Sequence, residues 1–145
     1  EWVDFPRAGN DWSYKYARRQ WSLVDNPELK YQYLNNFDRG LIKLLKKHHI
    51  LTADDTHNLW VDQEQKLLLY RKADLVFAFN FHPNASYPQC LIATGRSGKY
   101  KVIFDTDNAE AGGQERIAHT TYTTDAAGKL SLYLPCRTAV ILERL

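Results

Sequence analysis

The sequence has no methionine, only two cysteines and no long apolar run among its 145 residues. No stretch approaches the ~18 apolar residues of a membrane span, so we expect no transmembrane helix. Cys90 and Cys136 are too few for a disulfide framework, and we interpret them as reduced core thiols rather than as a disulfide. The chain starts at Glu1 and does not show its translation start, which leaves a fragment of a longer protein as an open option. Residues 1–4 do not predict a signal peptide.

The sequence also has no large excess of positive or negative charge. The 19 basic and 17 acidic residues give a net charge of +2, so nothing draws the chain broadly to nucleic acid or to an anionic membrane. We therefore expect neither as a partner. With 44% hydrophobic and 25% charged residues, 7 Gly and 5 Pro, the composition excludes collagen-like, coiled-coil and disordered classes. The length suits one domain, or one domain with an appendage.

A helix is the clearest element in the first half of the chain, predicted over residues 27–49. Asn26 suits the N-cap, Pro27 the first helical position and Glu28 the positive end of the helix dipole. Residues 1–26 before it show no periodicity and mix aromatic, charged and turn-forming residues, so they predict an irregular loop with at most a short helical piece. Positions three and four apart form one apolar stripe: Leu34, Phe37, Leu41, Leu44 or Leu45, and His48.

The second half of the chain, residues 59–145, is typical of β structure throughout. Short alternating runs are separated by turn formers such as 95–98 and 111–113, which favours an antiparallel sandwich or barrel. The run 75–81 is apolar on both faces, so we expect a central strand covered on both sides. The predicted strands are 59–62, 66–72, 75–81, 89–94, 100–105, 120–124, 130–134 and 138–143.

Three features could suggest catalytic or metal chemistry, and each has a simpler explanation. The pairs 48–49 (HH) and 54–55 (DD) could suggest a metal site, but no Cys/His spacing supports zinc. We interpret them as a helix end and a solvated turn. Residues 105–108 (DTDN) resemble the start of a calcium loop, but no Glu follows at the twelfth position. Cys90 has no acid–base partner in sequence that would make it a nucleophile. We expect no metal and no cofactor.

An aromatic and basic segment near the start is the best candidate for a binding surface. Flat rings stack on sugar faces, and guanidinium groups donate paired hydrogen bonds to hydroxyls or carboxylates. The same composition also suits packing of the loop on its scaffold or, less well, stacking on single-stranded nucleic acid. The candidate substrate-binding residues are Trp12, Tyr14, Tyr16, Arg18 and Arg19.

Several stretches along nearly the whole chain are distinctive together: residues 1–10 (EWVDFPRAGN), 12–14 (WSY), 16–21 (YARRQW), 34–38 (LNNFD), 75–83, 98–105 (GKYKVIFD), 112–113 and 135–142. In these stretches the sequence resembles the C-terminal part of 1,4-α-glucan (glycogen) branching enzymes, members of the α-amylase superfamily. The resemblance is closest to the eukaryotic-type branch.

The resemblance implies a parent enzyme that cuts an α-1,4 glucan and transfers the segment to a 6-hydroxyl, with catalysis carried by a (β/α)8 barrel. Residues 1–58 would be a remnant of that barrel, its last long loop and helix, and residues 59–145 a Greek-key β-sandwich of the amylase C-terminal type. None of the acids here matches the family's nucleophile or acid/base, so this chain alone should be inactive. The implied partners are an α-glucan and the missing barrel, and the implied location is the cytoplasm.

Two other functions stay open from the sequence. A free-standing glycan-binding β-sandwich would need an exposed aromatic platform on the β domain. A protein-interaction module would need an exposed apolar patch, and the helix stripe could supply one when its barrel is absent. Without a barrel the stripe must either fold back onto the β domain or pair with a second chain. We favour folding back, because the connection 51–58 is short.

Overall fold

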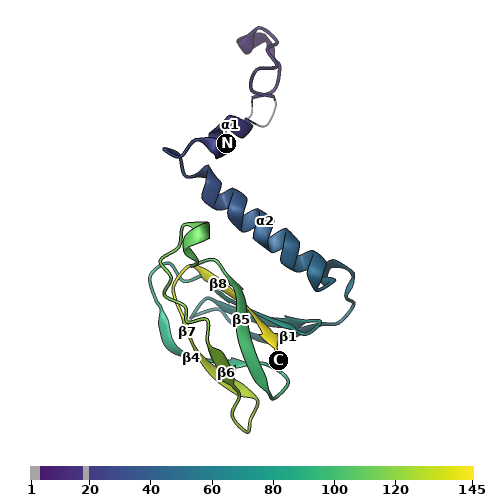
Figure 1. Ribbon diagram of the computed structural model, residues 1–145, viewed down its shortest axis with the longest axis vertical. Helices are drawn as coiled ribbons and strands as arrows, with labels where there is room; N and C mark the ends of the chain where they lie inside the picture. The colour runs from purple at the N-terminus through teal and green to yellow at the C-terminus, as the bar shows by residue number, and fades with distance from the viewer. Residues whose placement is uncertain (1–3, 18–19) are drawn as a thin grey trace.

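Alternating strands build two antiparallel sheets in the computed structural model, which describes residues 4–17 and 20–145 (Figure 1). Within these residues all eight predicted strands are present, some longer by one to three residues than expected. Their bounds are β1 Thr56–Asp62, β2 Leu67–Lys72, β3 Leu75–Asn80, β4 Tyr87–Ala93, β5 Lys99–Asp105, β6 Thr121–Thr123, β7 Lys129–Leu134 and β8 Thr138–Arg144.

The sheets form a sandwich with the expected antiparallel pairing. The larger sheet has the order β1-β2-β3-β8-β5-β6, and the smaller one pairs β4 with β7. Strand β8 closes the chain by inserting between β3 and β5, so the last strand returns beside one laid down much earlier. That return is the Greek-key connection expected for this class. The sandwich core comes from inward-facing residues of both sheets, with Val76 and Ala78 of β3 fully buried.

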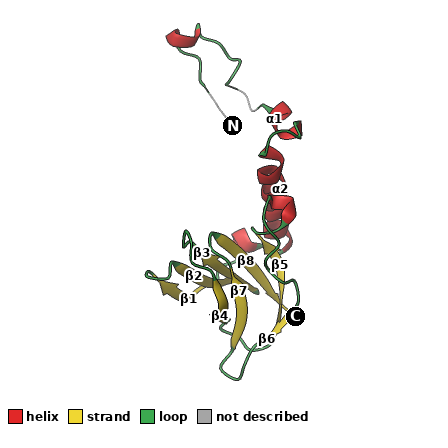
Figure 2. Ribbon diagram, turned by 90° about the vertical axis from the view of Figure 1, so that its left-hand side faces the viewer, coloured by secondary structure: helices red, strands yellow, loops and turns green. Residues whose placement is uncertain are grey.

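The other face of the larger sheet is covered by α2, Tyr31–Lys47 (Figure 2). Leu75 and Phe77, which alternate with Val76 and Ala78 along β3, are buried on this side with Leu44 of the helix. The expectation that the run 75–81 is covered on both faces is therefore confirmed for β3. The helix stripe folds back onto the sheet within one chain. Leu41 and Leu45 of α2 pack on this second cluster, together with Tyr70, Phe79, Ile103 and Phe104.

Three details of the helix prediction are wrong, and one of them is its end, which lies at Lys47 instead of residue 49. The helix begins at Tyr31 instead of Pro27, because the side chain of Asn26 accepts the Glu28 amide and its carbonyl accepts the Leu29 amide, which closes a separate turn. A short helix α1, Trp21–Asp25, lies before that turn. Leu34 does not join the buried stripe, since it is 64% exposed.

Past the C-terminal end of α2 the chain is anchored again on the sheet. His49 adopts a left-handed conformation with φ 52°, which turns the chain into a short 3-10 helix at Ile50–Thr52. Ile50 is 5% exposed and belongs to the same apolar cluster as Leu44. The helix is thus tied to the β domain along its C-terminal half and just beyond it.

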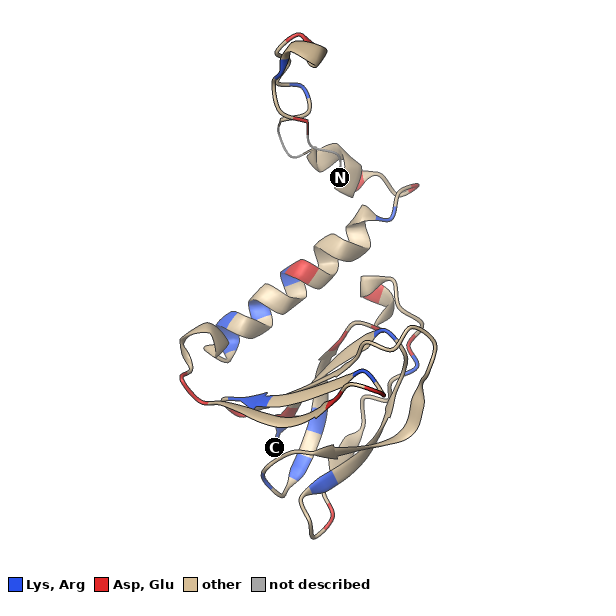
Figure 3. Cartoon of the chain, turned by 180° about the vertical axis from the view of Figure 1, so that it is seen from behind, with Lys and Arg blue, Asp and Glu red and all other residues tan. Residues whose placement is uncertain are grey.

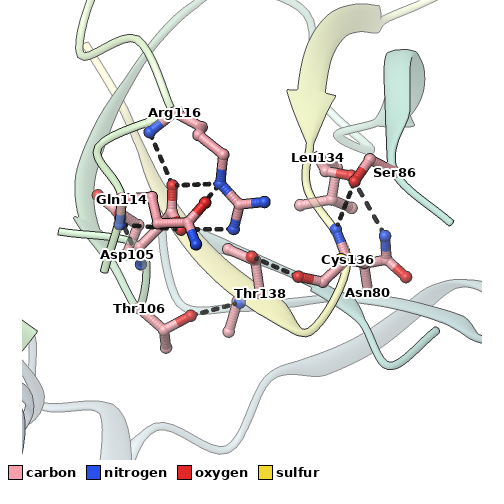
Figure 4. Close-up of polar contacts among 11 residues, drawn as sticks. Asn80, Ser86, Asp105, Thr106, Gln114, Arg116, Leu134, Cys136 and Thr138 are labelled. Atoms are coloured by element: carbon pink, nitrogen blue, oxygen red, sulfur yellow. Dashed lines mark hydrogen bonds and ion pairs between the residues drawn. The ribbon is translucent and has the colours of Figure 1, made fainter. Parts of the chain in front are cut away.

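The connection from β5 to β6 is organised by the carboxylate of Asp107. Its oxygens accept the Arg116 guanidinium at 2.6 Å and the Arg116 amide at 2.7 Å, while the Gln114 amide lies at 3.4 Å; the contacts of Arg116 and Gln114 are drawn in Figure 4. Burial raises the pKa of Asp107, but the hydrogen bonds from Arg116 and Gln114 outweigh it and hold the pKa below its usual value. Gly113 has no side chain where a Cβ would collide with the Asp107 backbone.

The two thiols are unpaired, as expected, but only one is in the core. Cys90 is 5% exposed in the sandwich, and burial raises the pKa of its thiol to about 11. The interpretation of Cys136 as a core thiol is wrong. It is half-buried where the chain turns from β7 into β8, and its amide donates to the Ser86 hydroxyl at 3.0 Å (Figure 4).

The packing of α2 predicts that its buried stripe, and not its whole apolar surface, stabilises the fold. Phe37→Ser and Leu41→Ser should each lower the free energy of unfolding by about 1–3 kcal/mol, less than for fully buried side chains because both are half-buried. Leu34→Ser is the matched control and should change it by no more than about 0.5 kcal/mol. Urea unfolding measures the difference, and light scattering should show a monomer throughout. Equal midpoints for Leu41→Ser and Leu34→Ser would contradict this packing.

The Asp107 contacts predict an acid-dependent contribution to stability. A carboxyl with a lowered folded pKa stabilises fully above its unfolded value, ~3.9, and this is lost as pH falls through the folded pKa. Asp107→Asn should therefore be less stable than the wild type by about 2 kcal/mol at neutral pH, with the gap closing below about pH 4. Asp74→Asn, which removes an exposed pair with Arg96, is the control and should change little. Urea midpoints against pH test this, and a gap that persists in acid refutes it.

Candidate functional site

The predicted binding segment forms a closed loop at the start of the chain. The Asp4 amide donates to the Tyr16 carbonyl at 3.1 Å and thereby joins the two ends of residues 4–16. Inside the loop, the Arg7 side chain donates to both Asp4 carboxylate oxygens at 3.1 and 3.2 Å, and the Asn10 amide group adds a third contact at 3.1 Å. The Arg7 hydrogen bond lowers the pKa of Asp4 more than burial raises it. We call residues 4–17 the aromatic loop.

The aromatic loop presents its rings to solvent and lies away from the β-sandwich. Figures 1 and 2 place it beyond α1, at the far end of the molecule from the sheets. The exposed fractions of Trp12, Tyr14 and Tyr16 are 66%, 71% and 39%. Trp12 has φ 56°, an uncommon conformation for a residue with a side chain, which turns the chain back after the 3-10 helix Ala8–Asn10. In the structure these rings therefore do not pack on the β-sandwich.

Of the five residues predicted to bind substrate, the structure describes the three aromatic ones. Arg18 and Arg19 lie outside the described residues. The Lys15 ammonium lies 5.1 Å from the centre of the Tyr16 ring, so a cation already contacts one ring of the loop. The loop can offer flat apolar surfaces and hydrogen-bond donors, which suits binding rather than bond cleavage.

A second site lies where α2 meets the end of β5, and we call it the seam pocket. It has a volume of about 230 Å³. The Asp105 carboxylate is buried there and accepts the His119 imidazole at 2.7 Å and the Asp107 amide at 2.8 Å. The pocket's principal lining residues are Asn36, Phe37, Phe104, Asp105, Glu110 and His119.

The local sequence does not reveal the seam pocket. Asp105 and Asp107, in the stretch that resembles the start of a calcium loop, instead pair with His119 and Arg116. No local pattern predicts a role for His119, because it follows Asp105 by 14 residues and no period joins the two. Within the described ranges, no group of three or more His, Cys, Asp or Glu could hold a metal ion.

Charged residues lie on both the helix and the β domain. Those of α2 are one acid, Asp38, and four basic residues, whereas both signs occur over the β domain (Figure 3). In the part of the chain that the structure describes, no helix is long and apolar enough to cross a bilayer.

Comparison with known proteins identifies relatives across nearly the whole chain. The chain is 40% identical to the 1,4-alpha-glucan-branching enzyme of Equus caballus over 150 residues, and 38% identical to that of Saccharomyces cerevisiae over 149 residues. These alignments cover 99% and 98% of this chain but only 22% and 21% of the relatives, so the chain spans about a fifth of their length. The resemblance noted from the sequence is therefore confirmed.

The fold has a solved relative as well. An α-amylase from H. orenii superimposes with a TM-score of 0.53 at 17% identity, over 86% of this chain and 22% of that one. This similarity concerns the fold alone. Residues 60–144 also match the family described as "Alpha amylase, C-terminal all-beta domain", a range that includes every strand from β2 to β8 and the last three residues of β1. The chain therefore belongs to the family of α-amylase C-terminal all-β domains.

Proposed function

We propose that this chain is the C-terminal part of a 1,4-α-glucan-branching enzyme, which cuts an α-1,4 glucan and joins the cut segment to a 6-hydroxyl. The observation that carries the proposal is the extent of the identity. It reaches 38–40% over 98–99% of the chain, and so includes the aromatic loop and α2 as well as the β-sandwich. An all-β domain alone occurs beside many chemistries, whereas the preceding segment ties this one to branching enzymes.

In this proposal residues 1–58 belong to the catalytic barrel, and residues 59–145 form the C-terminal domain. One side of α2 is already used, since Leu41 and Leu44 lie on the larger sheet. Apolar side chains of α2 remain uncovered, because Leu34, at the N-terminal end of the same stripe, is 64% exposed and Ile42, on the adjacent face, is 46% exposed. A helix whose apolar residues extend beyond the sheet that it covers suits a position between two layers, here the β-sandwich and the rest of the barrel. The barrel is thus the first proposed partner.

The role proposed for the chain itself is accessory rather than catalytic. A retaining glucan transfer uses a carboxylate nucleophile and a separate carboxylic acid/base close to it. The most buried acids of this chain have structural partners instead, Asp105 with His119 and Asp107 with Arg116. The Asp4 carboxylate is held by Arg7. The same assignment implies a cytoplasmic location, where a glucan of the glycogen type would be the substrate.

The aromatic loop is proposed as part of the glucan-binding surface of the parent enzyme. Its ends are tied by backbone, and its carboxylate–guanidinium pair fixes the turn that carries Trp12. Trp12 and Tyr14 therefore point into solvent from a loop of fixed conformation, and a sugar ring can stack on their side chains. Arg18 and Arg19 complete the proposed binding residues from the sequence.

The accessory role predicts that the 145-residue chain is inactive by itself. Incubated with amylose, it should leave the iodine-stained absorbance and the debranched chain-length profile unchanged, because the nucleophile and the acid/base are not in it. The full-length enzyme prepared from the same host should change both. A time-dependent loss of iodine colour with the purified chain alone, in a preparation free of host enzyme, would overturn this role.

The binding role of the aromatic loop predicts a ring-specific effect in the full-length enzyme. Trp12→Ala and Tyr14→Ala should each lower kcat/KM on amylose by roughly twofold to tenfold, the factor expected for about 0.5–1.5 kcal/mol of ring contact. Trp12→Phe keeps a flat ring and should retain most activity. Leu91→Ala, at an exposed apolar residue of β4, is the control. An unchanged kcat/KM in both alanine variants would show that the aromatic loop does not bind the substrate.

A further inference from the structure

The seam pocket combines a polar floor with an apolar wall, on elements far apart in sequence. Asn36 and Phe37 come from α2, while Phe104 and Asp105 come from the end of β5. The short 3-10 helix Ala109–Ala111 lies beside α2 and closes one side (Figure 1). At about 230 Å³ the pocket is somewhat smaller than the ~300–1,000 Å³ of drug-sized ligands, which suits one small ring rather than an extended chain.

The polar groups of the pocket retain unused hydrogen-bonding capacity. The Asp105 side chain is only 2% exposed, and within the described residues each of its oxygens accepts one hydrogen bond, although a carboxylate has about four acceptor positions. The Asn36 amide donates to the Glu110 carbonyl at 3.1 Å, and among the described residues its own oxygen accepts nothing. His119 is hydrogen-bonded through Nε2, and its Nδ1 makes no hydrogen bond within those residues. Acceptors and an imidazole thus face one small space.

The apolar wall is fixed by close packing. The Phe37 and Phe104 rings meet at 5.5 Å between centroids with a tilt of 51°. Phe104 can reach this position because residue 40 is Gly. A Cβ there would lie 3.0 Å from the Phe104 Cε2 atom, so any side chain would push the helix and the ring apart. Both rings are half-buried and border the pocket.

We propose that the seam pocket binds one glucosyl unit of an α-1,4 glucan, as a second contact separate from the aromatic loop. A pyranose has an apolar C–H face and a rim of hydroxyls, which matches a phenyl wall beside a carboxylate, an amide and an imidazole. Asp105 accepts hydrogen bonds from sugar hydroxyls, and His119 and Asn36 form hydrogen bonds with the neighbouring hydroxyls. The identity of the sugar rests on the proposed function, whereas the polar and apolar halves of the site rest on the structure.

The acidic residues of the seam pocket favour a neutral sugar over negatively charged small molecules. Two acidic residues, Asp105 and Glu110, line the pocket, so phosphate or a carboxylic acid would meet repulsion there. A neutral polyol meets no such cost and gains a charge-assisted hydrogen bond from each hydroxyl that reaches Asp105. A small amine is the remaining competitor, and the experiment below distinguishes it by using both compounds.

The test is a titration of the whole 145-residue chain with maltotriose, followed by the imidazole proton signals of its five histidines. We expect the signals of His119 to shift saturably and those of His57, an exposed residue of β1, to stay constant. Methylamine at equal concentration should not reproduce the shift. Lactate serves as the anion and should not reproduce it either. A shift with methylamine but not maltotriose, or no saturable His119 shift, overturns the proposal.

Variants locate the contact. His119→Ala and Asn36→Ala should each weaken maltotriose binding by about threefold to tenfold, as for the loss of one or two hydrogen bonds. His57→Ala and Asn58→Ala, an exposed histidine and asparagine on β1, are matched controls and should bind as the wild type does. If His119→Ala unfolds, Asn36→Ala decides the result, because Asn36 lies on the helix surface and makes one exposed hydrogen bond. Equal binding by Asn36→Ala and Asn58→Ala contradicts the site.

The two proposals fail in different ways. If Trp12→Ala with Tyr14→Ala abolishes maltotriose binding while Asn36→Ala has no effect, the aromatic loop binds glucan and the seam pocket does not. If the full-length enzyme branches amylose but maltotriose leaves His119 unshifted, the proposed function holds and the seam-pocket proposal is wrong. If maltotriose shifts His119 but the full-length enzyme has no branching activity, the pocket is a glucan site in a protein of another function.

Discussion

The structure depends on the burial of both faces of β3. Its alternation places Val76 and Ala78 in the sandwich core and Leu75 and Phe77 under α2, so one six-residue strand takes part in both apolar clusters. Each fully buried aliphatic or aromatic side chain contributes roughly 1.5–3 kcal/mol. A strand buried in this way must have a layer on each side, and α2 supplies the second. The helix is therefore part of the same folded unit as the sheets, although the family match begins only at residue 60.

Because α2 is held on the sheet, the β5–β6 connection must fit between them. Two carboxylates on this connection, Asp105 and Asp107, each take a side chain from further along the chain, His119 and Arg116 respectively. Their bonds replace the regular ladder that this irregular segment lacks. The seam pocket is a consequence of that arrangement. Its floor is a buried carboxylate that stabilises the connection, and its wall is the aromatic contact between helix and strand.

Elements with a regular period were predictable from the sequence, whereas contacts across long sequence separations were not. The eight strands and the helix follow from alternation and the i, i+3, i+4 spacing. The helix start was misplaced because Asn26 and Pro27 fit a cap equally well in the separate turn that they form. The seam pocket depends on Asn36, Asp105 and His119, which share no local pattern. The aromatic loop was recognisable by composition, yet its closure by Asp4 and Tyr16 needed the structure.

The positions of the two proposed contacts suggest how a polymeric ligand would be held. The aromatic loop lies beyond the N-terminal end of α2 (Figure 1), and residues of α2 itself line the seam pocket. Each offers few contacts and would bind a single sugar unit weakly. A glucan chain that reaches both converts the second contact into an intramolecular one, so the two weak affinities multiply through an effective concentration. Such a pair would select long chains over short ones without any change at either contact.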